Sequence, residues 1–198
     1  MKKIFTSFLF IIIITSIFKN VYCHEFWIDP INYHLENSNQ ISAKLLIGEN
    51  FLGSQLPYSK KEFEITNLYS GNKKIKIKGR LGDLPALNTK KGNTGINILQ
   101  VISAINYVDY DGLLKFDIFS RKKGYRNLAE EHQYNNYPLK FIESYKRYAK
   151  SIVSIDNHQG SDLDTGMDLE LIFLDNPLLE LKKNKRILLE YKNNILAD

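Results

Sequence analysis

Residues 73–78 read KKIKIK, and residues 41–47 read ISAKLLI. In both stretches apolar and polar side chains alternate, which is the two-residue period of a β-strand with one buried face and one face in water. The same short period recurs in four further segments, which are residues 63–69, 96–105, 169–174 and 186–191. The repeated alternation predicts a mainly β fold.

Polar turns that contain glycine separate these segments. Residues 70–72 read SGN and residues 92–95 read GNTG, and both Gly and Asn tolerate the positive φ angles that tight turns require. Residues 25–30 alternate like an edge strand that ends at Pro30. Regularly spaced strands with polar turns predict an Ig-like antiparallel β-sandwich.

Residues 112–150 interrupt the strand pattern. Pro138 suits the first position of a helix, and Glu143 and Arg147 stand four residues apart, as a helical ion pair requires. An aromatic and aliphatic stripe at helical spacing follows the proline and consists of Phe141, Tyr145, Tyr148 and Ile152. These features predict a helix that begins near Pro138.

Two segments upstream complete the expected insertion. Residues 125–133 contain no helix breaker and predict a short helix, whereas residues 113–123 fit a strand and a helix equally well. We therefore expect a helical insertion, at about residues 112–150, set into the β-sandwich.

The first 23 residues have the features of a cleavable signal peptide. Lys2 and Lys3 precede an apolar run over residues 4–18, which is shorter than the roughly 20 apolar residues of a membrane-spanning helix. Val21 and Cys23 fit the positions before a cleavage site, so that His24 becomes the first residue of an exported chain. An uncleaved anchor and a lipoprotein acylated at Cys23 are the alternatives. With cleavage we expect no stable membrane span.

Removal of this leader changes the charge and the thiol content. Lys2, Lys3 and Lys19 leave with it, so 27 basic residues become 24 against 22 acidic ones, and the net charge falls from +5 to +2. Nucleic-acid binding requires a concentrated basic face, and this balance does not predict one. Cys23 is the only cysteine, so the remaining chain has neither a thiol nor a disulfide. Its length supports a core without covalent cross-links, and one domain spanning residues 24–198 is expected.

The motifs of common enzyme classes are absent from the sequence, which contains no phosphate-binding glycine loop, no Cys/His zinc spacing and no nucleophile elbow. We therefore expect a protein that is not an enzyme. Asp162, Asp164 and Asp168 do not fit the spacing of a calcium-binding EF-hand, and we interpret them as a polar, solvated loop. Glu143, Arg147 and Lys150 are expected on a solvated face, with a buried ion pair as the alternative.

Histidine offers the one plausible metal chemistry. After cleavage His24 carries a free α-amine next to its imidazole, and these two nitrogens together chelate a divalent ion. A second imidazole would strengthen the set, and the sequence contains only His34, His132 and His158 as candidates. Imidazole suits nickel, copper and zinc. The four histidines are therefore the candidate metal ligands, although each of the last three is more commonly a hydrogen-bonded residue.

The chain also resembles a known family along its length. The matching motifs are HEFWIDP (residues 24–30), IGENFLG (47–53), PY (57–58), GDLPA (82–86), KF (115–116) before Gly124, ESYKRYAK (143–150), LEL (169–171) and NP (176–177). With them the chain resembles a widespread group of bacterial periplasmic proteins linked to the periplasmic components of nickel and cobalt uptake systems.

The resemblance implies a periplasmic β-sandwich with helices inserted around residues 112–150, and it favours a helix for residues 113–123. Members of the group commonly continue into a second β-sandwich, which we expect this chain to lack. Two hypotheses follow. In the first, a periplasmic accessory binds nickel or cobalt, with copper or zinc as further candidates, and assists uptake together with an envelope or transporter protein. In the second, the sandwich is a structural or interaction module of the envelope that binds no metal.

Overall fold

The computed structural model describes residues 25–180 and 184–197. Within them the chain forms two compact units, each of which is described separately. The larger unit contains residues 25–107 and the described residues from 144 onward, and the smaller unit contains Val108–Glu143. The described part is mainly β, as the alternation predicts, and both of its helices belong to the smaller unit.

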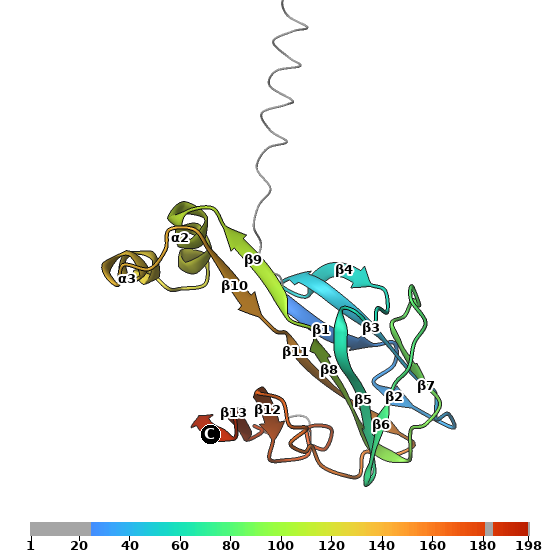
Figure 1. Cartoon of the computed structure of the whole chain (residues 1–198). Coiled ribbons are helices and arrows are strands. Elements are labelled where there is room, and N and C mark those ends of the chain that lie inside the picture. The colour runs from blue at the N-terminus through green and yellow to red at the C-terminus, as the bar shows by residue number, and fades with distance from the viewer. Residues whose placement is uncertain (1–24, 181–183, 198) are drawn as a thin grey trace, which may run out of the picture. The chain divides into compact units, whose positions relative to one another are not determined.

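The first sheet of the larger unit has β3 at its centre (Figure 1). β3 pairs antiparallel with β1 on one side and with β4 and β7 along different parts of the other side. Its residues Ile41, Ala43 and Leu45 are buried at every second position, which confirms the predicted alternation. The edge strand β1 ends at Pro30, also as predicted. The bounds are β1 (Glu25–Pro30), β3 (Ile41–Glu49), β4 (Leu52–Leu56) and β7 (Leu87–Thr89).

The second sheet contains five strands in the order β2-β11-β8-β5-β6. All neighbours run antiparallel except β2, which pairs with the end of β11 in parallel. The turn predicted at residues 70–72 joins β5 to β6, and Gly71 has a φ of 57° there. The bounds are β2 (His34–Leu35), β5 (Phe63–Ser70), β6 (Lys73–Lys76), β8 (Gly95–Ser103) and β11 (Tyr148–Ile155).

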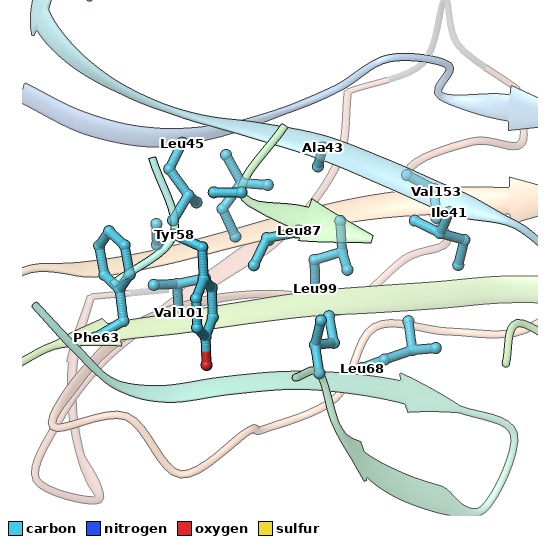
Figure 2. Close-up of a cluster of buried hydrophobic side chains, with 14 of the residues drawn as sticks. Ile41, Ala43, Leu45, Tyr58, Phe63, Leu68, Leu87, Leu99, Val101 and Val153 are labelled. Atoms are coloured by element: carbon cyan, nitrogen blue, oxygen red, sulfur yellow. The ribbon is translucent and has the colours of Figure 1, made fainter. Parts of the chain in front are cut away.

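The hydrophobic core lies between these two sheets (Figure 2). Leu45 of β3 and Leu87 of β7 come from the first sheet, and Leu68, Leu99 and Val101 come from β5 and β8 of the second. Burial of such aliphatic side chains on folding is the main stabilising contribution to a sandwich. The two facing sheets confirm the predicted β-sandwich.

β8 is buried on both faces. One face contributes Leu99 and Val101 to the core, whereas Gln100 on the opposite face donates hydrogen bonds to Thr165. The chain that follows β11 therefore forms a third layer over the second sheet. This layer continues into a three-stranded antiparallel sheet made of β12 (Leu169–Phe173), β13 (Ile187–Tyr191) and β14 (Asn194–Ala197).

The smaller unit consists of two helices and the adjoining parts of a two-stranded sheet. β9 (Asn106–Tyr110) leads into α2 (Leu113–Lys122) and α3 (Leu128–Tyr134), and β10 (Phe141–Tyr145) returns and pairs with β9. The resemblance correctly favoured a helix at residues 113–123, and the short helix predicted at 125–133 is confirmed as α3. Inside the unit, Tyr110, Phe116 and Phe141 contact one another with ring centroids 4.9–5.4 Å apart.

The predicted helix from Pro138 is wrong, because this stretch forms β10 and the start of β11. Residues 148–154 of β11 pair with β8, so the neighbouring strand satisfies backbone groups that a helix would have satisfied internally. The ion pair predicted between Glu143 and Arg147 is also absent. Glu143 instead accepts a hydrogen bond from the Tyr110 hydroxyl at 2.8 Å, and the Arg147 guanidinium lies over the Tyr145 ring. The helices of the insertion therefore end at Tyr134, well before residue 150.

Candidate functional site

Two of the four candidate histidines lie together at one end of the second sheet. His34 belongs to β2, which is placed beside β11 by its parallel pairing, so His34 is in register with Ser154. Nδ1 of His34 lies 2.8 Å from the Ser154 hydroxyl oxygen. The side chain of His34 is 36% exposed, and it lines an open groove of about 560 Å³ together with Asn32, Glu36 and Gln40.

His158 reaches the same serine because the chain reverses directly after β11. Asp156 adopts the left-handed conformation with a φ of 60°, and its carboxylate accepts a hydrogen bond from the Thr94 hydroxyl. Gly95 is required beside this turn, since a Cβ there would lie 2.6 Å from the Gln159 carbonyl oxygen and its φ is +94°. Nδ1 of His158 consequently lies 2.9 Å from the Ser154 hydroxyl oxygen.

The two imidazoles share one buried hydroxyl, and their ring centroids are 4.7 Å apart. A serine hydroxyl has a single proton to donate, so only one of the two contacts can use it. At least one of the two rings must therefore donate its Nδ1–H to Ser154. When that ring is neutral, its Nε2 carries the lone pair that a metal ion requires.

A carboxylate lies close to this pair. The nearer oxygen of Glu36 is 3.8 Å from Nε2 of His34, and the Glu36 side chain is exposed. On the other side, the side-chain amide of Asn176 donates to the carbonyl oxygen of His158 at 2.7 Å and so fixes the backbone of that loop. The site therefore offers two oriented imidazoles at the surface, with one acid within reach.

The other two candidate histidines do not join this pair in the described residues. His132 belongs to the smaller unit, where its ring stacks on Phe141 with centroids 4.5 Å apart and its Nε2 lies 2.8 Å from the Pro138 carbonyl oxygen. These contacts indicate a packing role for His132. His24 lies outside the described residues. Across residues 25–180 and 184–197 there is no cluster of three or more His, Cys, Asp or Glu side chains that could hold a metal ion.

A second polar cluster lies beneath the third layer, and the sequence interpretation missed it. Lys150 of β11 is bonded to two carboxylates, with its Nζ 2.7 Å from Oε1 of Glu170 and 3.0 Å from Oδ2 of Asp162. The exposed fractions of the Lys150, Asp162 and Glu170 side chains are 10%, 0% and 1%. The interpretation of Asp162 as part of a solvated loop is therefore wrong, as is the solvated face expected for Lys150. The alternative of a buried ion pair applies.

Backbone and hydroxyl donors surround both carboxylates of this cluster. Glu170 accepts hydrogen bonds from the backbone N–H and hydroxyl of Thr165 and from the backbone N–H of Met167. The Asp162 oxygens accept one backbone N–H each, from Leu163 at 2.8 Å and from Phe173 at 2.9 Å. Buried carboxylates require such donors.

Residues 21–190 of the chain match the family described as Domain of unknown function (DUF4198). The chain belongs to this family. No curated protein and no solved structure gives a significant match. The DUF4198 match includes His34 and His158 with their shared serine, as well as the Lys150 cluster. Neither helix in the described part of this DUF4198 protein is long and apolar enough to cross a membrane.

Sequence reasoning identified the histidines of the site but not the serine that joins them. Ser154 is an ordinary strand residue in the sequence, and only the parallel pairing of β2 with β11 places His34 beside it. The DUF4198 sequence has no comparable signal for the second cluster. Lys150 alternates with the buried Ala149 and so lies on the face of β11 that points away from the core, but only the third layer buries it there.

Proposed function

We propose that this protein is an exported accessory that binds a divalent transition metal ion, with His34 and His158 as two of its ligands. The main support for this proposal is that the hydroxyl oxygen of Ser154 lies 2.8 Å and 2.9 Å from the Nδ1 atoms of the His34 and His158 rings. Metal-binding histidines commonly use one ring nitrogen for such a partner and the other for the ion. The pair has the hydrogen bonding of a metal ligand pair when both rings donate Nδ1–H to the two lone pairs of the Ser154 hydroxyl oxygen, which leaves both Nε2 atoms free for the ion.

The expected ion is nickel or cobalt, and copper or zinc would also suit a nitrogen-rich site. Two imidazoles leave further coordination positions to be filled. Glu36 is a candidate donor because it already lies near His34. His24 is a separate candidate, since its amine and imidazole become available together if the leader is cleaved directly before it. It precedes Glu25 at the start of β1, whereas His34 follows the other end of that strand, so we do not count His24 as a ligand of this pair.

The proposed location is the periplasm, and it is supported by the basic and apolar pattern of residues 1–23. A surface site with two imidazoles suits a carrier that takes up an ion and passes it to an envelope or transporter protein. Assistance of nickel or cobalt uptake is accordingly the proposed role, with the family resemblance as its support.

Titration calorimetry with Ni²⁺, Co²⁺, Cu²⁺ and Zn²⁺ tests the metal site on the chain that begins at His24. We expect one ion per chain, with an affinity that falls by more than about 100-fold in His34→Ala and in His158→Ala, since each removes a direct ligand. The matched control is His132→Ala, which removes a packed histidine of the smaller unit and should leave the affinity unchanged.

The outcomes separate the contributions of the individual histidines. Equal binding by the wild type and by a His34→Ala, His158→Ala double variant would exclude the pair as the site. One extra residue ahead of His24 tests the amine alone, because the extension leaves the pair intact. Mass spectrometry of the protein secreted by its natural host shows whether His24 is in fact its first residue.

The second candidate function is an interaction module of the envelope without metal. It is favoured by apolar side chains of the smaller unit that face solvent, among them Leu114, which is 75% exposed, Ile118 and Ile142. Leu114 and Ile118 lie four residues apart on one face of α2, and exposed apolar surface that is contiguous marks protein interfaces. A photo-crosslinker at position 118, applied in intact cells, should then capture one envelope protein, and Leu114→Lys should abolish the capture. Capture that persists in Leu114→Lys would contradict this candidate.

A further inference from the structure

The buried cluster of Lys150, Asp162 and Glu170 has the composition and geometry of a self-modification site. It contains one amine and two carboxyl groups, all nearly removed from water, with the amine within 3.0 Å of both acids. An ammonium and a carboxylate without water are costly to maintain as ions, whereas an amide between them carries no charge. This cost favours condensation of the amine with one of the acids.

The two acids are held in different ways, which separates their roles. Three donor groups of Thr165 and Met167 bond to the Glu170 carboxylate in addition to Lys150, so its own charge is well solvated by the protein. Asp162 receives a single backbone N–H on each oxygen, apart from its contact with the amine. Glu170 is thus held in a fixed position beside the amine, and Asp162, which has fewer donors, is the carboxyl group suited to be attacked.

We propose that Lys150 and Asp162 form an intramolecular isopeptide bond, with Glu170 as the proton carrier. Glu170 accepts a proton from the Lys150 ammonium, and the neutral amine attacks Cγ of Asp162. A new N–C bond forms and one C–O bond of the carboxyl group breaks. Two protons pass from the nitrogen, by way of Glu170, to the departing oxygen, which leaves as water. Glu170 ends as a carboxylate, and no oxidant or other reactant is required.

The surroundings of Asp162 also suit this step. The N–H groups of Leu163 and Phe173 point at its two oxygens, where the tetrahedral intermediate carries its negative charge, and fixed donors of this kind stabilise such an oxyanion. The amine is held within van der Waals reach of the carboxyl group, so the loss of translational freedom is already complete.

An apolar groove of about 690 Å³ adjoins the cluster and includes Lys150 and Glu170 in its lining, together with Ile152, Met167 and Phe173. It provides an exit for the released water. Its apolar walls also limit the water that could compete for the hydrogen bonds of the three reacting groups.

Intact-mass spectrometry of the purified, folded chain that begins at His24 tests the proposal. We expect a mass about 18 Da below the value calculated for residues 24–198, because one water is lost. Tandem mass spectrometry of a protease digest should show one branched peptide that joins the segment around Lys150 to the segment around Asp162.

Three variants sharpen the result. Lys150→Arg and Glu170→Gln should each have the full calculated mass, because the first lacks the reacting amine and the second lacks the proton carrier. The matched control is Lys146→Arg, which changes the half-buried lysine that pairs with Glu64 and should retain the loss of water. Circular dichroism shows whether each variant is folded.

Two results would overturn the proposal irrespective of how the variants fold. One is a wild-type protein of full calculated mass after prolonged incubation at neutral pH. The other is a loss of water without the branched peptide, since an aspartate that closes on its own backbone as a succinimide loses the same mass.

Discussion

Substitution of Ser154 by alanine is the most direct probe of the histidine pair. Ser154 is fully buried on β11, and its hydroxyl serves both His34 and His158. Alanine fits the same space, and the backbone N–H at this position still bonds to the Tyr33 carbonyl oxygen at 2.9 Å. The variant therefore removes two hydrogen bonds and leaves the strand in place.

The magnitude follows from those two bonds. A net contribution of about 0.5–1.5 kcal/mol each predicts that Ser154→Ala lowers the free energy of unfolding by about 1–3 kcal/mol. Loss of the partner that orients a metal-binding imidazole typically weakens metal affinity by about 10–100-fold. Urea denaturation of the metal-free protein measures the first effect, and calorimetry with the tightest-binding ion of the series measures the second.

Ser151→Ala is the matched control, because Ser151 lies on the same strand and its hydroxyl has no hydrogen-bond partner among the described residues. Its free energy of unfolding should stay within about 0.5 kcal/mol of the wild type. If Ser154→Ala unfolds at the same urea concentration as Ser151→Ala and binds metal equally well, the serine does not organise the pair and the reasoning fails.

Two further predictions concern the sandwich and its third layer. Leu99→Ala in the core should lower the free energy of unfolding by about 2–5 kcal/mol, whereas Leu114→Ala, on an exposed helix position, should change it by less than about 0.5 kcal/mol in the same urea titration. Burial, and then the hydrogen bond to Asp168, raise the pKa of Tyr148 from 10.0 to about 12. The stabilisation linked to this shift is present below pH 10 and is lost as the pH rises through about 12. Asp168→Asn should lower the pKa of Tyr148 only in part, because burial is the larger cause of the shift. The pKa is measured from phenolate absorbance, with Tyr148→Phe as the reference. A return to 10.0 would show that burial contributes nothing.

The strands were predictable because each has one face in the core and one face elsewhere. In β3 this makes every second residue apolar. The alternation over residues 41–47 can therefore be recognised in the sequence without knowing which strands pair with β3. A helix was wrongly predicted for residues 138–152 because aromatic and aliphatic side chains recur there at spacings of three and four. Residues four positions apart lie on the same face of a strand and also on the same face of a helix. Phe141 and Tyr145 therefore fit both patterns. The pairing of this segment with β8 favours the strand over the helix. That pairing is a tertiary contact, which the local sequence pattern does not show.

The candidate site was predictable only as a set of residue types. The sequence contains four histidines and does not show which of them meet, since His34 and Ser154 are 120 positions apart. The buried cluster was hidden for a similar reason. Asp162 lies in a stretch rich in Ser, Thr, Gly and Asp that has the composition of a surface loop, yet the third layer folds it against the second sheet, where Lys150 neutralises it.

The two proposed sites depend on the same short segment. Lys150 and Ser154 lie four residues apart on the face of β11 that points away from the core, while His158 and Asp162 lie four residues apart in the chain that folds back over that face. A bond between Lys150 and Asp162 would close this segment into a loop, and a closed loop has less conformational freedom to lose when His158 is fixed on Ser154. Preorganisation of that kind raises the affinity for a ligand without any new contact. Lys150→Arg should therefore weaken metal binding although residue 150 is no ligand, whereas an unchanged affinity would mean that the hydrogen bonds of Ser154 and Asn176 alone hold His158 in position.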